Sequence, residues 1–196
     1  MGLNQTIFQW IHAGAGTRPL IDALAVFFAE AGPFLLAAYL LVLWFRVRAD
    51  KKILLIEAAE AALIGLTLNQ LAGLLYYQPR PFMMGLCTPL LAHVPENSFP
   101  SDHATLMFGA ALYLLMKRGG GMHGLILLAA ACFTAWARIY VGIHFPFDMA
   151  GSLLIALAAA GLTLGLSIFF TPLNSSLIRV IELVLRRFSI THHKFS

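Results

Sequence analysis

The sequence predicts an all-α protein: a polytopic membrane bundle of about five transmembrane helices, with a short interfacial helix at each end. The first observation is composition, because 60% of the 196 residues are hydrophobic and only 11% are charged, which excludes an ordinary soluble domain. The second is that the apolar residues form long runs, and a helix needs roughly 20 of them to cross a bilayer. Five such spans nearly use up the chain, so we expect one integral-membrane domain over residues 1–196.

The amino end predicts a short helix lying in the membrane interface. Residues Leu3 to His12 combine apolar Ile7, Phe8 and Ile11 with polar Asn4 and Gln5. An amphipathic segment of this length is too short to span a bilayer.

The predicted spans follow this helix in order. The first span contains Gly32-Pro33, which predicts a kink or a break in the helix. We therefore expect Leu20 to Glu30 to lie partly in the membrane interface. The last is followed by Arg179, Glu182 and Arg186 at helical spacing, typical of an amphipathic segment lying along the membrane. The five apolar runs are Pro19 to Phe45, Ile53 to Tyr77, Ser101 to Met116, Gly124 to Ala137 and Pro146 to Phe170.

The basic residues predict the orientation. If five spans alternate across the membrane, only Arg18, Arg80 and Arg138 of the 13 Lys and Arg residues fall on one side. The positive-inside rule places the other, richer side in the cytoplasm and the loops bearing Arg80 and Arg138 outside. Basic residues that anchor topology and anionic lipid give no reason to expect a nucleic-acid partner.

Titratable residues gather in the outer loops, which is a functional hypothesis because charges near a bilayer are costly. Arg80 stands between two prolines, where a guanidinium can grip phosphate oxygens in bidentate fashion or can simply snorkel to lipid headgroups. Ser101 follows Pro100 and is a good N-cap, so a helix is expected to begin there with its free amides facing an anion site. His103 lies on its first turn, placed for proton transfer.

A third segment runs from Arg138 to Asp148. Pro146 suits the first turn of the last span, so His144 is expected just outside that helix and Asp148 just inside it. Asp148 can hold one imidazole nitrogen of His144 and leave the other free as a nucleophile, or it can merely complement the helix dipole.

These residues resemble the three signature segments of the type 2 phosphatidic acid phosphatase superfamily of membrane lipid phosphatases: Arg80-Pro81, then Pro100-Ser101-x-His103, then Arg138 followed by His144 and Asp148. The strings from Glu96 to His103 and from Gly142 to Asp148 resemble its bacitracin-resistance branch, the undecaprenyl-diphosphate phosphatases of bacteria.

The resemblance implies phosphoryl transfer in two steps through a phosphohistidine on His144, with Asp148 supporting that ring and His103 exchanging the proton. It implies that Arg80, Arg138, Ser101 and the helix-start amides hold the phosphate oxygens, with no metal and no cofactor. The implied substrate is a polyprenyl diphosphate at the outer face of the bacterial inner membrane, and the partners are that lipid and the membrane lipids around it.

Three positions depart from the superfamily pattern. Gly73 stands where a phosphate-binding lysine is expected, and Ala137 replaces a serine. Asp102 replaces a glycine, and we include it among the phosphate-site residues, although its charge beside a diphosphate requires that it face away, pair with Arg80 or Arg138, or be protonated. Asn69, Gln70 and Gln78 are candidates for the missing lysine's hydrogen bonds, or for helix packing.

Alternatives remain at this stage. The lipid could be phosphatidylglycerophosphate, phosphatidic acid or a lipid A phosphate, and a transporter that binds a lipid phosphate without cleaving it would also carry buried charges. Glu30 could contact the site or snorkel to water. Glu57 and Glu60 are expected to pair with Lys52 or Arg118 near the cytoplasmic end of the second span.

Overall fold

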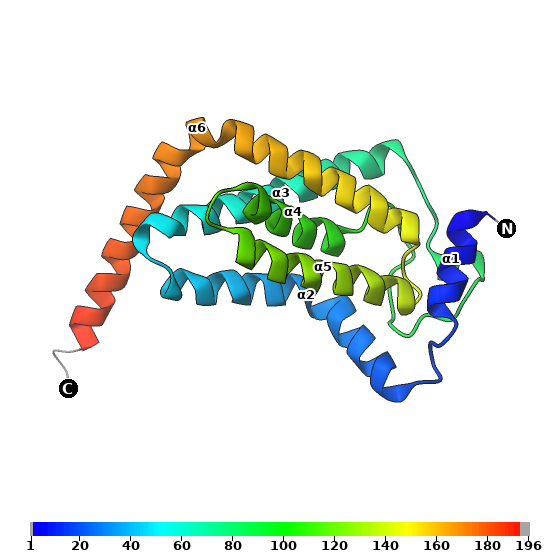
Figure 1. Ribbon diagram of the computed structural model, residues 1–196. Helices are drawn as coiled ribbons and strands as arrows, with labels where there is room; N and C mark the ends of the chain where they lie inside the picture. Colours follow the sequence, from blue (N-terminus) through cyan, green and yellow to red (C-terminus); the bar gives the residue numbers. More distant parts are fainter. Residues whose placement is uncertain (1, 193–196) are drawn as a thin grey trace.

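The structure is a computed structural model that describes residues 2–192, with side chains as far as Leu185. Its helices pack as a bundle whose loops gather at two ends (Figure 1). The described elements are α1 (Leu3–His12), α2 (Pro19–Arg46), α3 (Lys52–Leu75), α4 (Asp102–Met116), α5 (Gly121–Tyr140) and α6 (Pro146–His192), with short 3-10 turns η1 (Ala49–Lys51) and η2 (Pro81–Met84).

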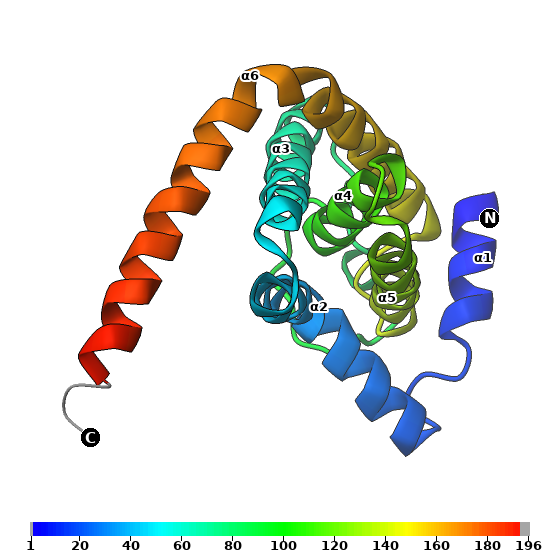
Figure 2. The same ribbon diagram turned by 60° about the vertical axis from the view of Figure 1, so that its left-hand side comes forward.

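The five helices expected as spans are all present, and the protein is a multi-pass membrane protein. Four described segments are long and apolar enough to cross a bilayer: α2, η1 with α3, α5 and α6. The exception, α4, has 15 residues and is about 22 Å long. It can be short because it forms the centre of the bundle, packed against α3, α5 and α6 (Figure 2).

Helix α2 bends at Gly32-Pro33 without breaking. Its helical conformation continues from Pro19 to Arg46, but the first part of the helix leaves the direction of the rest (Figure 1). The kink predicted from Pro33 is therefore present, and the first half of α2 slants outward from the bundle at the end that carries α1 (Figure 1).

The amphipathic carboxy-terminal segment is helical, as expected, but it continues α6 instead of forming a helix of its own. Helix α6 runs through Pro172 to His192, and its second half diverges from the bundle (Figure 2). Glu182 on this half pairs with Lys52 of α3, with 3.0 Å between Nζ and Oε1. The side chain of Arg186 lies outside the described residues.

Glu57 pairs differently from the expectation. Its carboxylate is buried on α3, where it accepts a hydrogen bond from the Tyr113 hydroxyl and lies 3.3 Å from Nζ of Lys117. Lys117 replaces the expected Lys52 and Arg118 because it ends α4 directly beside α3, whereas Lys52 is taken by Glu182.

Helix α1 has the predicted bounds and lies against the end of the bundle that holds the loops between α3 and α4 and between α5 and α6 (Figure 1). Phe8 is fully buried and meets the ring of Phe145 edge-on. The Asn4 Oδ1 accepts the backbone N–H of Phe147 at 3.0 Å, and His12 Nδ1 donates to the Tyr140 carbonyl at 2.7 Å. Helix α1 therefore holds the α5–α6 loop at both of its ends.

Candidate active site

The three segments singled out in the sequence meet around one cavity of about 290 Å³ at the α1 end of the bundle. Five of the seven predicted site residues line it, Asp148 lies behind His144, and Ser101 is buried at the start of α4. The lining residues are Asn69, Gln70, Gly73, Arg80, His93, Glu96, Asn97, Phe99, Pro100, Asp102, His103, Arg138 and His144.

The contacts of His144 define which of its ring nitrogens is free to react. Nε2 lies 3.1 Å from Nη1 of Arg80 and 3.2 Å from Nη2 of Arg138. A guanidinium can only donate, so Nε2 must be the acceptor and the proton must sit on Nδ1. The lone pair of Nε2 is therefore directed toward the two arginines.

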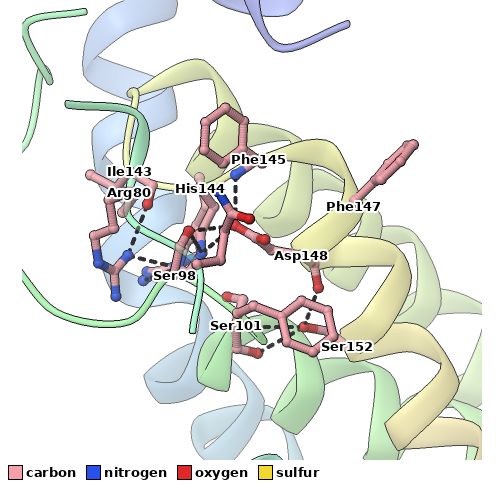
Figure 3. A network of polar contacts seen from close by, with 12 residues as sticks. Arg80, Ser98, Ser101, Ile143, His144, Phe145, Phe147, Asp148 and Ser152 are labelled. Atoms are coloured by element: carbon pink, nitrogen blue, oxygen red, sulfur yellow. Dashed lines mark hydrogen bonds and ion pairs between the residues drawn. The ribbon is translucent and has the colours of Figure 1, made fainter. Parts of the chain in front are cut away.

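The other nitrogen of His144 faces a carboxylate and a hydroxyl (Figure 3). Nδ1 lies 3.3 Å from Oδ2 of Asp148 and 3.3 Å from Oγ of Ser98. The Ser98 hydroxyl donates to the same Oδ2 at 2.5 Å, and the backbone N–H of Phe145 donates to it at 2.8 Å. Two donors thus fix Asp148 in position, and Asp148 in turn fixes the ring of His144.

The two arginines are buried, and the Nε donor of each is unused within the described residues. Arg80 is 4% exposed, and its Nη groups contact the Ile143 carbonyl, His144, Glu96 and the Asn97 carbonyl. Arg138 is 3% exposed and donates from Nη1 to the Ala29 carbonyl at 2.7 Å. Among the described residues, Nε of each has no hydrogen-bond partner. A buried unpaired donor is unfavourable, and guanidinium groups bind anionic oxygens strongly.

Burial and positive charge set the ionisation of the loop residues. Burial, followed by the charges of Arg138 and Arg80, lowers the pKa of His144 well below its usual value, so this imidazole is neutral. Burial and the charge of Arg80 also lower the pKa of His93. Burial lowers the pKa of Arg80 as well, and the charge of Glu96 partly offsets this. A neutral His144 is the state that can act as a nucleophile.

Ser101 is the N-cap of α4, as its position after Pro100 predicts. Its hydroxyl accepts from the backbone N–H of Ala104, and its own N–H donates to the Ser152 hydroxyl at 2.9 Å (Figure 3). The single proton of the Ser152 hydroxyl is shared between the Ser101 carbonyl at 3.1 Å and the Asp148 carbonyl at 2.9 Å, which ties the start of α4 to α6. Direct phosphate binding by the Ser101 hydroxyl stays a prediction.

Asp102 accepts hydrogen bonds from two side-chain amides, and no described arginine forms an ion pair with it. Its Oδ1 accepts from Nδ2 of Asn69 at 2.7 Å and from Nε2 of Gln70 at 3.2 Å. Asn69 also accepts from the Thr105 hydroxyl at 2.8 Å, so it joins α3 to the first turn of α4. Two amides therefore hold Asp102 at the rim of the cavity.

Gly73 lines the cavity at the position of the missing lysine, and the side chain of Asn97 packs beside it. Asn97 uses all of its amide: Nδ2 donates to the carbonyls of Gly73 and Tyr76, and Oδ1 accepts from the N–H groups of Gln78 and Phe99. Asn97 thereby joins the end of α3 to the loop that carries Ser98.

Sequence reasoning gave no role to Ser98, His93, Glu96 or Asn97, although all four lie at the site. Three of them form the string Glu96-Asn97-Ser98 directly before Phe99 and Pro100. A polar string at a bilayer surface is a weak signal, because any solvated loop has one. Within the described residues, no group of three or more His, Cys, Asp or Glu side chains is placed to hold a metal ion.

The fold and the site together define an integral-membrane phosphatase. The chain belongs to the PAP2 superfamily, whose profile matches residues 53–169 and so includes every predicted site residue.

Relatives support the same assignment. The chain is 29% identical to "Undecaprenyl-diphosphatase BcrC" of Bacillus subtilis over 94% of this chain and 95% of that protein. It is 34% identical to "Putative undecaprenyl-diphosphatase YbjG" of Escherichia coli over 78% of this chain and 76% of that one. The crystal structure of Aquifex aeolicus LpxE superposes with a TM-score of 0.69 at 26% identity, covering 84% of this chain and 96% of LpxE.

Proposed function

We propose that this protein hydrolyses undecaprenyl diphosphate to undecaprenyl phosphate and inorganic phosphate. The observation that carries the proposal is the arrangement around His144: Nε2 faces Arg80 and Arg138, while Nδ1 faces Asp148. The names of the two bacterial relatives support the diphosphate as substrate.

The first step forms a phosphohistidine. The terminal phosphoryl group enters between Nε2 of His144 and the guanidinium groups, whose donors then bind its oxygens. Nε2 attacks phosphorus, and the bond from phosphorus to the bridging oxygen breaks. Undecaprenyl phosphate leaves, and His103 supplies a proton to its oxygen. The ring of His144 becomes cationic, and the carboxylate of Asp148 stabilises that charge through Nδ1–H.

The second step returns the enzyme to its starting state. His103, now neutral, takes a proton from water as the water oxygen attacks phosphorus. The bond between phosphorus and Nε2 breaks, and inorganic phosphate is released. Arg80 and Arg138 hold the same equatorial oxygens in both steps, so a single cavity serves both transfers.

An apolar groove suits the polyprenyl tail of this substrate. It has a volume of about 450 Å³ and lies between α2, α3 and α4, with Leu36, Leu40, Leu63 and Leu106 among its lining residues. Leu106 lies one helical turn beyond His103 on α4, so the groove begins next to the phosphate cavity. A lipid whose headgroup occupies the cavity could therefore lay the first part of its tail in the groove.

The experiment uses the purified protein in lipid vesicles with undecaprenyl diphosphate labelled in its terminal phosphate. We expect label release and, after rapid quenching, label on the protein that acid removes. His144→Ala should lose both while retaining lipid binding. Release of label by His144→Ala would refute the nucleophile, and faster turnover of phosphatidylglycerophosphate, phosphatidic acid or a lipid A phosphate would refute the substrate. Binding without release by the wild type would indicate a transporter.

We further propose that the site faces the exterior of the bacterial inner membrane. The support is the positive-inside rule, because the loops at the other end of the bundle carry most of the Lys and Arg residues. Single cysteines at Val94 and Arg48, both exposed, can be placed in a cysteine-free background. A membrane-impermeant maleimide should label Val94→Cys in intact spheroplasts. Labelling of Arg48→Cys alone would show that the orientation is the opposite of the proposed one.

A further inference from the structure

The kink in α2 leaves one backbone carbonyl without its helical partner. In an α-helix the N–H of each residue donates to the carbonyl four residues earlier, and Pro33 has no N–H. The carbonyl of Ala29 therefore cannot receive its usual hydrogen bond. Ala29 is fully buried, so water is not at hand to replace the missing donor.

Arg138 supplies the replacement. Its Nη1 donates to the Ala29 carbonyl at 2.7 Å, while Nη2 of the same guanidinium lies 3.2 Å from Nε2 of His144. A guanidinium is planar and rigid, so fixing one terminal nitrogen fixes the position of the other. The carbonyl freed by Pro33 thus sets where Arg138 meets the nucleophile.

Gly32 allows α2 to come close enough for this contact. A Cβ at Gly32 would lie 2.9 Å from Cγ2 and 3.0 Å from Oγ1 of Thr134. Thr134 lies one turn before Arg138 on the face of α5 that meets α2. The dipeptide Gly32-Pro33 therefore does two separate things: Gly32 permits the close packing, and Pro33 frees the carbonyl.

We propose that Pro33 is a positioning residue for catalysis, because its missing N–H leaves the Ala29 carbonyl free to orient the phosphate-binding guanidinium of Arg138. This inference rests on the proposed function to the extent that Arg138 binds the transferred phosphoryl group. It adds a segment outside the matched range of the superfamily profile to the machinery of the site.

The test restores the N–H. Pro33→Ala supplies a donor that can compete for the Ala29 carbonyl and release Arg138. We expect kcat/KM for undecaprenyl diphosphate and affinity for inorganic phosphate each to fall roughly tenfold to a hundredfold, as for loss of a hydrogen bond to a charged group. Replacing Pro33 by the α-hydroxy analogue of alanine, which has an ester oxygen in place of the N–H, should retain most of both.

Two comparisons separate positioning from general damage. Pro172→Ala removes the other proline in the interior of a described α-helix, in α6, and should leave phosphate affinity unchanged. In an Arg138→Lys background, Pro33→Ala should lower phosphate affinity by a further factor of less than about two, because Arg138, the residue through which Pro33 acts, is already altered. An equal loss in both backgrounds, or an equal loss from the alanine and its ester analogue, would overturn the inference.

Phosphate affinity, measured by ³¹P line broadening, does not depend on which lipid is hydrolysed. If the wild type binds phosphate and Pro33→Ala weakens that binding, the inference stands even when undecaprenyl diphosphate is not turned over. If turnover is confirmed but Pro33→Ala binds phosphate as the wild type does, the inference fails and the proposed function remains.

Discussion

The hydroxyl of Ser98 lies 2.5 Å from Oδ2 of Asp148, the same oxygen that faces Nδ1 of His144. Ser98 comes from the loop before α4 and Asp148 from the first turn of α6. Side chains from two segments about 50 residues apart thus form one chain of hydrogen bonds that ends at the proposed nucleophile.

Ser98→Ala should lower kcat roughly tenfold with little change in KM. The variant loses a donor to a buried carboxylate, so Asp148 holds His144 less firmly, while Arg80 and Arg138 keep their contacts. Steady-state kinetics measure the changes in kcat and in KM separately. Ser167→Ala is the control, since among the described residues that hydroxyl donates only to the Leu164 carbonyl on α6. A rise in KM with unchanged kcat would show that Ser98 acts on substrate binding.

Gly73→Lys should tighten inorganic phosphate binding roughly threefold to tenfold by adding a positive charge to the cavity wall. Position 73 can accommodate a Cβ atom, because that atom would lie 3.5 Å from its nearest neighbour, Nδ2 of Asn97, which is an ordinary van der Waals contact. Gly73→Met carries a similar length without charge and should show no gain. The gain should shrink in high salt, and a gain with methionine would refute the electrostatic cause.

Glu96→Gln should also tighten phosphate binding, by roughly twofold to fivefold. Glu96 lies 3.1 Å from Nη2 of Arg80 and lines the cavity, so its negative charge opposes an incoming anion. The effect should be modest because the carboxylate side chain is 56% exposed. Inhibition by phosphate measures it. Weaker binding in this variant would mean that Glu96 serves mainly to orient Arg80.

The stability of the ligand-free protein should rise with pH up to about 6.5, the pKa of an unfolded histidine. The folded state lowers the pKa of His144 and of His93, so between the folded and unfolded values the unfolded chain binds more protons. Each such proton gives a slope of about 1.4 kcal/mol per pH unit, so acidification through this window destabilises the protein. Thermal unfolding in detergent from pH 5 to 8 measures the slope, and His144→Gln should reduce it.

Phe8→Ala should destabilise the protein by about 3 to 5 kcal/mol, as for a large buried aromatic side chain. Phe8 is fully buried against Phe145, which adjoins His144, so turnover should fall as well. Leu3→Ala on the same helix is the control, because Leu3 is 67% exposed. A wild-type melting temperature for Phe8→Ala would show that α1 is only loosely held.

The sequence by itself determined the helices and the residues of the motifs. Apolar runs locate membrane helices because an unpaired backbone cannot cross a bilayer, and so α2 to α5 lie where composition placed them. Pro33 and Ser101 predicted a kink and a helix start for equally local reasons, since one lacks an N–H and the other accepts one.

Only the tertiary structure decided which polar groups meet. The pairing of Asp102 with Asn69 and Gln70, of Glu57 with Lys117, and of Arg138 with the Ala29 carbonyl joins segments at least 32 residues apart. Hydrogen bonds act over about 3 Å, so partner choice depends on helix packing and register, which hydrophobic patterning does not encode. The sequence therefore specified the chemistry available at one end of the bundle, and packing chose the contacts.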